Sequence, residues 1–165
     1  MLPLLHIPAP TPARKVTGYQ MPEESARLLG WEFVVAQAEA ARHYWLSSVF
    51  ADGRPHAVPL WGLWYQNRVH FEGSPQTAWV RNLQQDPRCV LHLPSGDQVV
   101  IIEGSAHMIA DDQLSAEEWL DLDTRFQHKY QVQHGSPYWY LQPHKILAWN
   151  GEDLQTMTRW VFRDS

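Results

Sequence analysis

The pattern of apolar positions changes its period several times along the chain. In residues 31–42, apolar residues recur at intervals of three and four, which is typical of a helix packed on a sheet. Residues 43–51 are rich in strand formers, and Asp52-Gly53 follows. Because such a pair takes the positive φ values of a type I′ turn, we expect a hairpin that returns through residues 54–66.

Two prolines interrupt this return strand. Pro55 and Pro59 have no N–H to give to a ladder, so we expect them at an edge, a bulge or a gap that faces a ligand. Asn67-Arg68 indicates the next turn, and residues 69–72 the third strand.

A helix is expected after the third strand. Ser74 is a good N-cap and Pro75 a good first helical residue, and the pattern ends near Gln85, before Asp86-Pro87. Strands are predicted at 88–93 and 98–109. Residues 99–102 are apolar on both faces, which indicates a central place in the sheet.

The last third of the chain predicts one helix and two strands. The helix begins at Asp112 or Ser115 and runs to about Tyr130. Residues 131–144 resemble a loop, and the final strands, 145–149 and 156–162, flank an Asn-Gly turn.

Six or seven mostly hairpin-connected strands and three helices predict a mainly β fold, a β-barrel with flanking helices. Repeated βαβ units are absent, which excludes a doubly wound sheet. Residues 1–29 contain five prolines and are predicted to form an extended arm across a surface. Residues 30–165 are expected to form one domain.

Charge and cysteine content narrow the function classes. With 13 basic and 18 acidic residues the net charge is −5, which argues against a nucleic-acid partner. Cys89 is the one cysteine, so an internal disulfide and a cysteine-rich zinc site are excluded, and its alternating strand indicates a buried, inert thiol. No apolar run is long enough to cross a membrane and the first residues do not resemble a signal peptide, so a cytoplasmic location is expected.

Nine tryptophans suit a core, a ring-binding pocket or a subunit interface, and composition does not choose among them. The chain has no Rossmann glycine fingerprint, no P-loop, no nucleophile elbow and no zincin motif. Its nine histidines do not pair at helical spacing, and no metal site is expected.

The segment that begins at Ser74 has a more specific character. It places Ser74 and Thr77 at a helix N-terminus, followed by Arg81 and Asn82. Free N–H groups and the helix dipole make such an end a natural phosphate site. A plain capped helix would show the same residues.

The run from His43 to Trp64 resembles the pyridoxamine 5′-phosphate oxidase-like split-barrel superfamily, and it is most similar to the branch that includes deazaflavin-dependent reductases. The resemblance extends in order and spacing over residues 25–162. Its further matches are Ser74, Thr77 and residues 81–83, 86–88, 100–104, 126–130, 145–149 and 158–162.

The resemblance implies a six-stranded antiparallel split barrel of the FMN-binding type that forms a homodimer. An FMN or deazaflavin cofactor would lie in a groove at the dimer interface, where the second chain closes the pocket. Backbone N–H groups of residues 57–60 would bond the ring, with a gap at Pro59. The cofactor-binding residues implied are His56, Ala57, Val58, Pro59, Leu60 and Trp61 along the strand, and Ser74, Thr77, Trp79, Arg81 and Asn82 at the phosphate.

One residue departs from the family's pattern. Trp79 stands where related chains usually have a lysine for the phosphate. A charge-assisted hydrogen bond to phosphate contributes roughly 1.5–3 kcal/mol, so its loss would weaken binding by about one to two powers of ten. Arg81 or Arg54 would replace the lysine, or the chain has abandoned the phosphate, or Trp79 stacks on a different ring.

The resemblance implies an FMN-dependent oxidoreductase that transfers hydride to a small conjugated substrate, with a deazaflavin coenzyme as the alternative cofactor. A flavin carrier or sensor without catalysis and a structural dimer that has lost the phosphate site remain open. No side chain stands out as a general acid or base. Oxidation of pyridoxamine phosphate itself is not expected, because the C-terminal region lacks a recognisable basic cluster.

Overall fold

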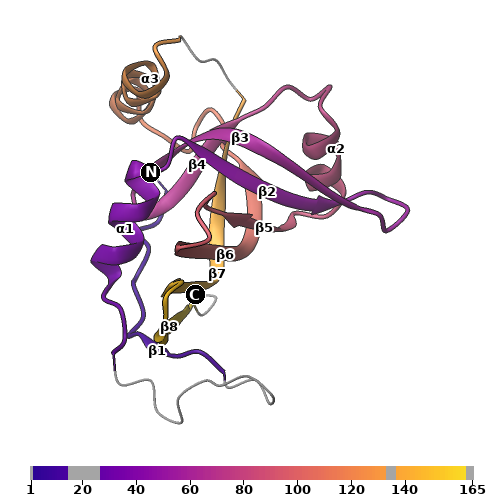
Figure 1. The fold of residues 1–165 in the computed structure, drawn as a ribbon. Coiled ribbons are helices and arrows are strands. Elements are labelled where there is room, and N and C mark those ends of the chain that lie inside the picture. Colours follow the sequence, from indigo (N-terminus) through magenta and orange to yellow (C-terminus); the bar gives the residue numbers. More distant parts are fainter. Residues whose placement is uncertain (1, 15–26, 133–136, 163–165) are drawn as a thin grey trace.

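The computed structural model describes residues 2–14, 27–132 and 137–162. These residues form three helices around a sheet, and Figure 1 shows how strongly the sheet is curved. The elements in chain order are β1 (Thr11–Pro12), α1 (Trp31–Ala40), β2 (His43–Val49), β3 (Pro55–Tyr65), β4 (Arg68–Glu72), α2 (Ala78–Gln85), β5 (Arg88–His92), β6 (Gln98–Met108), α3 (Ala116–Tyr130), β7 (Tyr138–Asn150) and β8 (Asp153–Val161).

The sheet closes into a six-stranded antiparallel barrel. Its strand order is β7-β4-β3-β2-β5-β6, and β6 pairs again with β7. The barrel is split at β7, whose other side pairs with β4 through residues 138–140 and with β8 from Lys145 onward. The predicted mainly β barrel with flanking helices is confirmed, and residues 99–102 do lie in a strand paired on both sides.

The expectation of a loop over residues 131–144 is wrong for its second half. β7 begins at Tyr138 and pairs with β6 through a register shift between Glu103 and Gly104. Within β7, Pro143 lies opposite Gly104, beyond the last β4 pairing and before the first β8 pairing. A proline is tolerated there because no strand needs its N–H on the split side.

Several element boundaries also differ from the predictions, including the start of β8 at Asp153, and two of them bear on the site. The turn before β4 is formed by Gln66 and Asn67, both with positive φ (49° and 59°), so Arg68 is already the first residue of the strand. Helix α2 begins at Ala78 with Thr77 as its N-cap, and Ser74 therefore does not cap it. Ser74 instead closes a turn, accepting the Thr77 N–H on its carbonyl (2.9 Å).

Two helices fill the barrel core from different sides. In Figure 1, α1 lies beside one end of the barrel, and α2 lies at the other, next to the projecting β2–β3 hairpin. Trp31 of α1 contacts the rings of Trp64 and Trp160, at 6.1 and 5.6 Å between centroids. Trp79 and Leu83 of α2 belong to the same buried cluster. Apolar burial therefore positions both helices.

Helix α3 covers a second, smaller cluster. Its N-cap is Ser115, one of the two predicted starts, and Ser115 and Glu118 also form a capping box. Leu122 and Phe126 are fully buried against Tyr138 at the start of β7. This cluster fixes α3 against the split side of the barrel.

The described part of the N-terminal segment lies along the barrel. Leu2 is buried in the α3 cluster, the Pro3 carbonyl accepts a hydrogen bond from Arg68 (2.8 Å), and β1 pairs with β8. The predicted arm also includes residues 1 and 15–26, which lie outside the described residues. Among the helices described, none combines the length and apolarity that a membrane span requires.

Candidate functional site

The candidate site begins with an open edge on β3. Residues 55–61 pair with β2 alone, whereas β4 joins β3 only from Gly62 onward. The register would place Glu72, the last residue of β4, beside Trp61. The chain therefore leaves the sheet at the point where the β3 edge opens, and the turn toward α2 starts there.

The hairpin hydrogen bonds show which backbone groups face this edge. Phe50 N–H donates to the Arg54 carbonyl (2.9 Å), so even-numbered residues of β3 bond to β2 and odd-numbered residues face the edge. Pro55 and Pro59 therefore stand where no β2 ladder bond is lost, and the predicted edge position is confirmed. Of residues 57–60, Ala57 alone directs an N–H toward the edge, because Val58 and Leu60 bond to β2 and Pro59 has no N–H. The Ala57 N–H is therefore the one backbone donor of this stretch that is available to a cofactor ring.

The predicted strand residues divide between two faces. Ala57, Pro59 and Trp61 are exposed on the outer face of the barrel. His56 and Val58 are half-buried and Leu60 is buried on the inner face. These two sets would contact different sides of a ligand at the edge.

A buried hydrogen-bond chain joins α2 to this hairpin. The Asn82 side-chain amide donates to Ser48 Oγ (3.1 Å), which lies 3.5 Å from His56 Nδ1. Ser48 and Asn82 are both about 4% exposed. The sequence analysis did not single out Ser48, although it is a polar residue at an inward position of a strand whose other inward residues, Tyr44 and Leu46, are apolar.

The turn before α2 is held by its own polar groups. Thr77 Oγ1 donates to the Ser74 carbonyl (2.8 Å), and Ser74 Oγ accepts the Gln76 N–H (3.2 Å). Arg81 is exposed and donates to the Gln76 carbonyl (2.6 Å). The guanidinium of Arg81 is thus tied to the helix N-terminus, where the first N–H groups have no partner within the helix.

Trp79 does not belong to this polar turn. It is 5% exposed and packs edge-on against Phe71 and Trp139, at 5.7 and 6.4 Å between ring centroids. Gly73 contacts the same ring so closely that a Cβ at Gly73 would overlap it. The ring therefore fills the core and leaves no face with which to stack on a ligand.

The outer face of the barrel presents a broad, largely apolar surface. Trp45 and Val161 are 37% and 48% exposed. Cross-strand partners share a face, so the register defines this surface. Its two rows, here called the outer sheet face, are Pro59, Trp45, His92, Ile101, Leu147 and Arg159, and Ala57, Ser47, Val90, Glu103, Lys145 and Val161.

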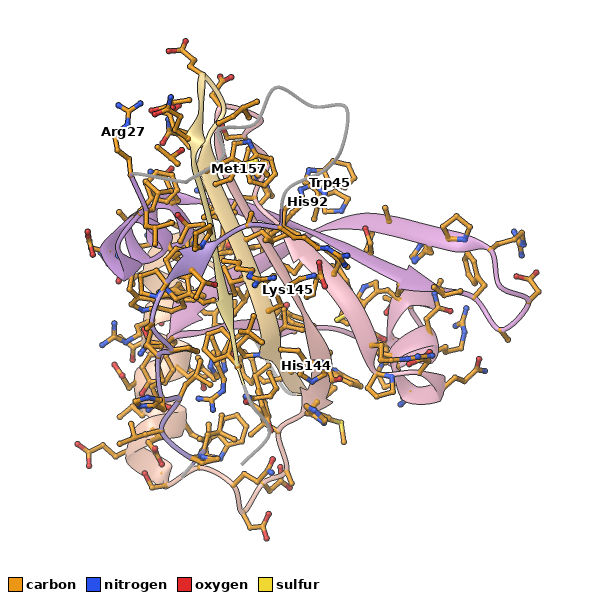
Figure 2. All side chains as sticks on the ribbon, turned by 90° about the horizontal axis from the view of Figure 1, so that it is seen from below. Arg27, Trp45, His92, His144, Lys145 and Met157 are labelled. Atoms are coloured by element: carbon orange, nitrogen blue, oxygen red, sulfur yellow. The ribbon has the colours of Figure 1, made fainter. Side chains whose placement is uncertain are left out.

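Figure 2 shows Trp45 and His92 side by side on this face, with Lys145 further across it on β7. The two rings stack at 6.4 Å with 5° between their planes. Lys145 forms an ion pair with Glu103 (2.7 Å), which neutralises the centre of the second row. The face therefore has little net charge at its centre.

The described residues offer neither a reactive thiol nor a metal cluster. Cys89 is buried, and burial raises the pKa of its thiol to about 12, so the prediction of an inert thiol is confirmed. No group of three or more metal-ligating side chains occurs among the residues that the structure describes.

Comparison with known proteins identifies the family. A family model described as pyridoxamine 5′-phosphate oxidase matches residues 31–150, and no curated protein sequence matches significantly. Rv2991 from Mycobacterium tuberculosis is 17% identical, with a TM-score of 0.62 over 79% of this chain and 91% of its own. A pyridoxamine 5′-phosphate oxidase-related, FMN-binding protein from Nostoc punctiforme is 16% identical, with a TM-score of 0.56 over 84% and 93%.

The heme storage protein HutZ from Vibrio cholerae shares the fold at 17% identity, with a TM-score of 0.55 over 70% of this chain and 91% of its own. At these identities the solved structures show the fold alone. The family model, however, covers well over half of the chain, including the open β3 edge and α2. The chain therefore belongs to the pyridoxamine 5′-phosphate oxidase family, whose split barrel it adopts.

Proposed function

We propose that this protein is an FMN-dependent oxidoreductase that transfers hydride to a small conjugated substrate. The observation that carries the proposal is the open edge of β3 over residues 55–61, next to a helix N-terminus with a tethered arginine. A strand edge offers backbone groups to a flat heterocycle, and a helix N-terminus offers N–H groups to a phosphate. The membership of the family and an FMN-binding relative support the choice of cofactor.

The residues at the edge would contact one side of a flavin ring. FMN, when bound, supplies the redox chemistry by accepting and donating hydride at its ring. Ala57 N–H would donate to the ring, since neighbouring Pro55 and Pro59 have no donor. The Asn82–Ser48 hydrogen bond would hold the hairpin at a fixed distance from α2.

The phosphate would be held without the family's lysine. The first N–H groups of α2, the Ser74 hydroxyl and the Arg81 guanidinium are the donors that the turn offers. Arg81 carries the positive charge among them, and its bond to the Gln76 carbonyl already orders its side chain. Less side-chain entropy is then lost when an anion binds.

A second protomer would complete the pocket. The outer sheet face begins at the open edge, since Ala57 and Pro59 belong to both. Pairing of two such faces would bury the exposed Trp45 and Val161 and would enclose the ligand between protomers. The homodimer is therefore part of the proposal.

The first experiment is a titration of the purified protein with FMN, the deazaflavin coenzyme and hemin in parallel. We expect saturation with FMN at micromolar concentration. Arg81→Ala should weaken FMN binding about tenfold or more, the effect of losing a charge-assisted hydrogen bond. Arg125→Ala, which changes an exposed arginine on α3, is the matched control and should leave the affinity unchanged.

The same titration separates the alternatives. Tighter binding of the deazaflavin coenzyme or of hemin would identify that molecule as the ligand in place of FMN, and HutZ is one of the relatives whose description names heme. FMN binding without oxidation of a reduced nicotinamide and without substrate turnover would favour a carrier or sensor. No binding of any of the three would favour a structural dimer.

A second variant tests the backbone donor. Ala57→Pro removes the N–H directed at the edge at a position equivalent to Pro55 and Pro59, so the strand should tolerate it. We expect FMN binding to weaken by about twofold to tenfold, the effect of one neutral hydrogen bond. Ala57→Ser keeps the N–H and should bind as the unchanged protein does.

A further inference from the structure

A second candidate site lies between α1, α3 and the end of β3. A cavity of about 480 Å³ opens there, outside the residues assigned to the cofactor. Leu63 and Trp64 give it an apolar wall, and Lys129 of α3 lines it. The remaining lining residues are Glu39, Asp121, Thr124, Arg125 and His128.

The environment of Lys129 is unusual for a lysine. Its side chain is half-buried, and Nζ donates to the Gly62 carbonyl (2.9 Å). The same nitrogen lies 5.1 and 5.5 Å from the ring centroids of Tyr44 and Tyr130. No carboxylate in the described part of the chain forms an ion pair with it, whereas Lys145 is paired with Glu103.

Burial and a neighbouring cation disfavour the protonated form of the Lys129 amine. Burial and, next, the nearby Arg42 lower the pKa of Lys129 to about 8. Glu39 on α1, Asp121, Arg125 and His128 on α3, Arg42 before β2, and the Tyr44 and Tyr130 hydroxyls are the titratable and charged groups around it. Asp121 is paired with Arg125 (2.9 Å), so its charge is largely satisfied.

We propose that this cavity is a carbonyl-binding site in which the Lys129 amine forms an imine with a small aldehyde. The amine lone pair attacks the carbonyl carbon and gives a carbinolamine. Both amine hydrogens leave with the carbonyl oxygen as water, and a C=N bond replaces the C=O bond. The step needs no oxidant or reductant.

The cavity suits a small, partly apolar aldehyde. Leu63 and Trp64 would contact its hydrocarbon part, while the Gly62 carbonyl holds the amine in place. A lysine becomes a nucleophile when it is desolvated and lies near another cation. Both conditions hold at Lys129, whereas Lys145 is paired with the carboxylate of Glu103.

The chain has three lysines, Lys15, Lys129 and Lys145, so labelling can be read residue by residue. The test is reductive alkylation of the intact protein at pH 7 with propanal and cyanoborohydride, followed by peptide mass spectrometry. An amine with a pKa near 8 is unprotonated in about one molecule in ten at pH 7, against about one in several thousand for an ordinary lysine. We expect Lys129 to react at least about tenfold faster than Lys145.

Two variants show whether the cavity matters. Thr124→Trp places a bulky side chain in the lining and should slow labelling of Lys129 several-fold without affecting Lys145. Gln127→Trp, at an exposed position of the same helix, is the control and should change neither rate. Equal labelling of Lys129 and Lys145, or a Lys129 rate that Thr124→Trp leaves unchanged, would overturn the proposal.

Discussion

At the residue scale, Trp79 is a residue expected at the phosphate that the structure places in the core instead. A lysine there would be expected to tighten phosphate binding only if position 79 faced the phosphate. Its buried ring instead packs between Phe71 and Trp139, and Gly73 leaves room for it. At the proposed phosphate site, affinity would therefore come from Arg81 and the helix N-terminus, whereas the buried ring at position 79 contributes stability.

The Trp79→Lys variant should accordingly be less stable than the unchanged protein, and it should not bind FMN more tightly. The substitution removes a large buried ring and places an ammonium group in an apolar core. We expect the free energy of unfolding in urea to fall by about 3–5 kcal/mol. Gln84→Lys, on the exposed side of the same helix, should change it by less than about 0.5 kcal/mol.

His70 makes a prediction for the pH dependence of stability. It is fully buried beside Tyr65 and Tyr140, and burial, with the Arg68 charge, lowers its pKa to about 3. An unfolded histidine titrates near ~6.5, so below that pH the unfolded state binds a proton that the native state excludes. Stability is then complete above about pH 6.5 and falls toward pH 3, by at most ~1.4 kcal/mol per pH unit.

Urea unfolding at pH 7, 6 and 5 measures this slope. In His70→Phe, the free energy of unfolding should depend less steeply on pH, by the equivalent of close to one proton. The phenyl ring fills the same space without titrating. His128→Gln changes an exposed histidine and should leave the slope as it is. An unaltered slope in His70→Phe would mean that another group causes the acid sensitivity.

Several residues could be assigned from the sequence because their reasons are local. Ser115 and Glu118 form a capping box within four residues, and Pro55 and Pro59 exclude a central strand by their own chemistry. The burial of Trp79 and the Asn82–Ser48 bond depend on segments far apart in the chain. The pattern of apolar residues in a helix predicts which side of the helix is buried. It does not identify the residues that this side contacts.

At the element scale, β7 is the strand that the sequence analysis found only in part. It makes two different pairings on one side, with β4 and then with β8, and Pro143 lies between them. A proline inside a strand pattern argues against a strand when all strands are assumed to be paired throughout. A proline inside β7 is possible because the barrel is split there. The split arises from pairing between segments far apart in the chain, so a local pattern does not predict it.

Gly104 lies opposite Pro143, next to the register shift between β6 and β7, and this position allows a prediction for its substitution. A Cβ on Gly104 would overlap the backbone carbonyl of Gln142, so one of the two strands must move. Gly104→Ala should lower the free energy of unfolding by about 1–3 kcal/mol, as for overpacking of a rigid core. Gly96→Ala is the matched control, since nothing lies near its added Cβ, and thermal unfolding of the two variants provides the comparison.

At the scale of the whole molecule, the inner face of the barrel is buried in the core, whereas part of its outer face is exposed to solvent. α1 and α2 contribute to the inner core, and α3 covers a separate cluster. The outer sheet face keeps Trp45 and Val161 partly in water. The aromatic surplus of the composition thus serves both the core and a surface, which composition alone did not separate.

Dimerisation through the outer sheet face is the last prediction. Trp45→Asp places a charge in the first row of that face, where an unpaired carboxylate would be desolvated on association. We expect the unchanged protein to sediment as a dimer at micromolar concentration and Trp45→Asp to sediment as a monomer of 19.2 kDa or to dimerise at least tenfold more weakly. Leu120→Asp is the control, because Leu120 is 68% exposed on α3 and lies outside that face. A monomer in the unchanged protein would remove the second wall of the proposed flavin pocket, and a dimer that resists Trp45→Asp would place the interface elsewhere.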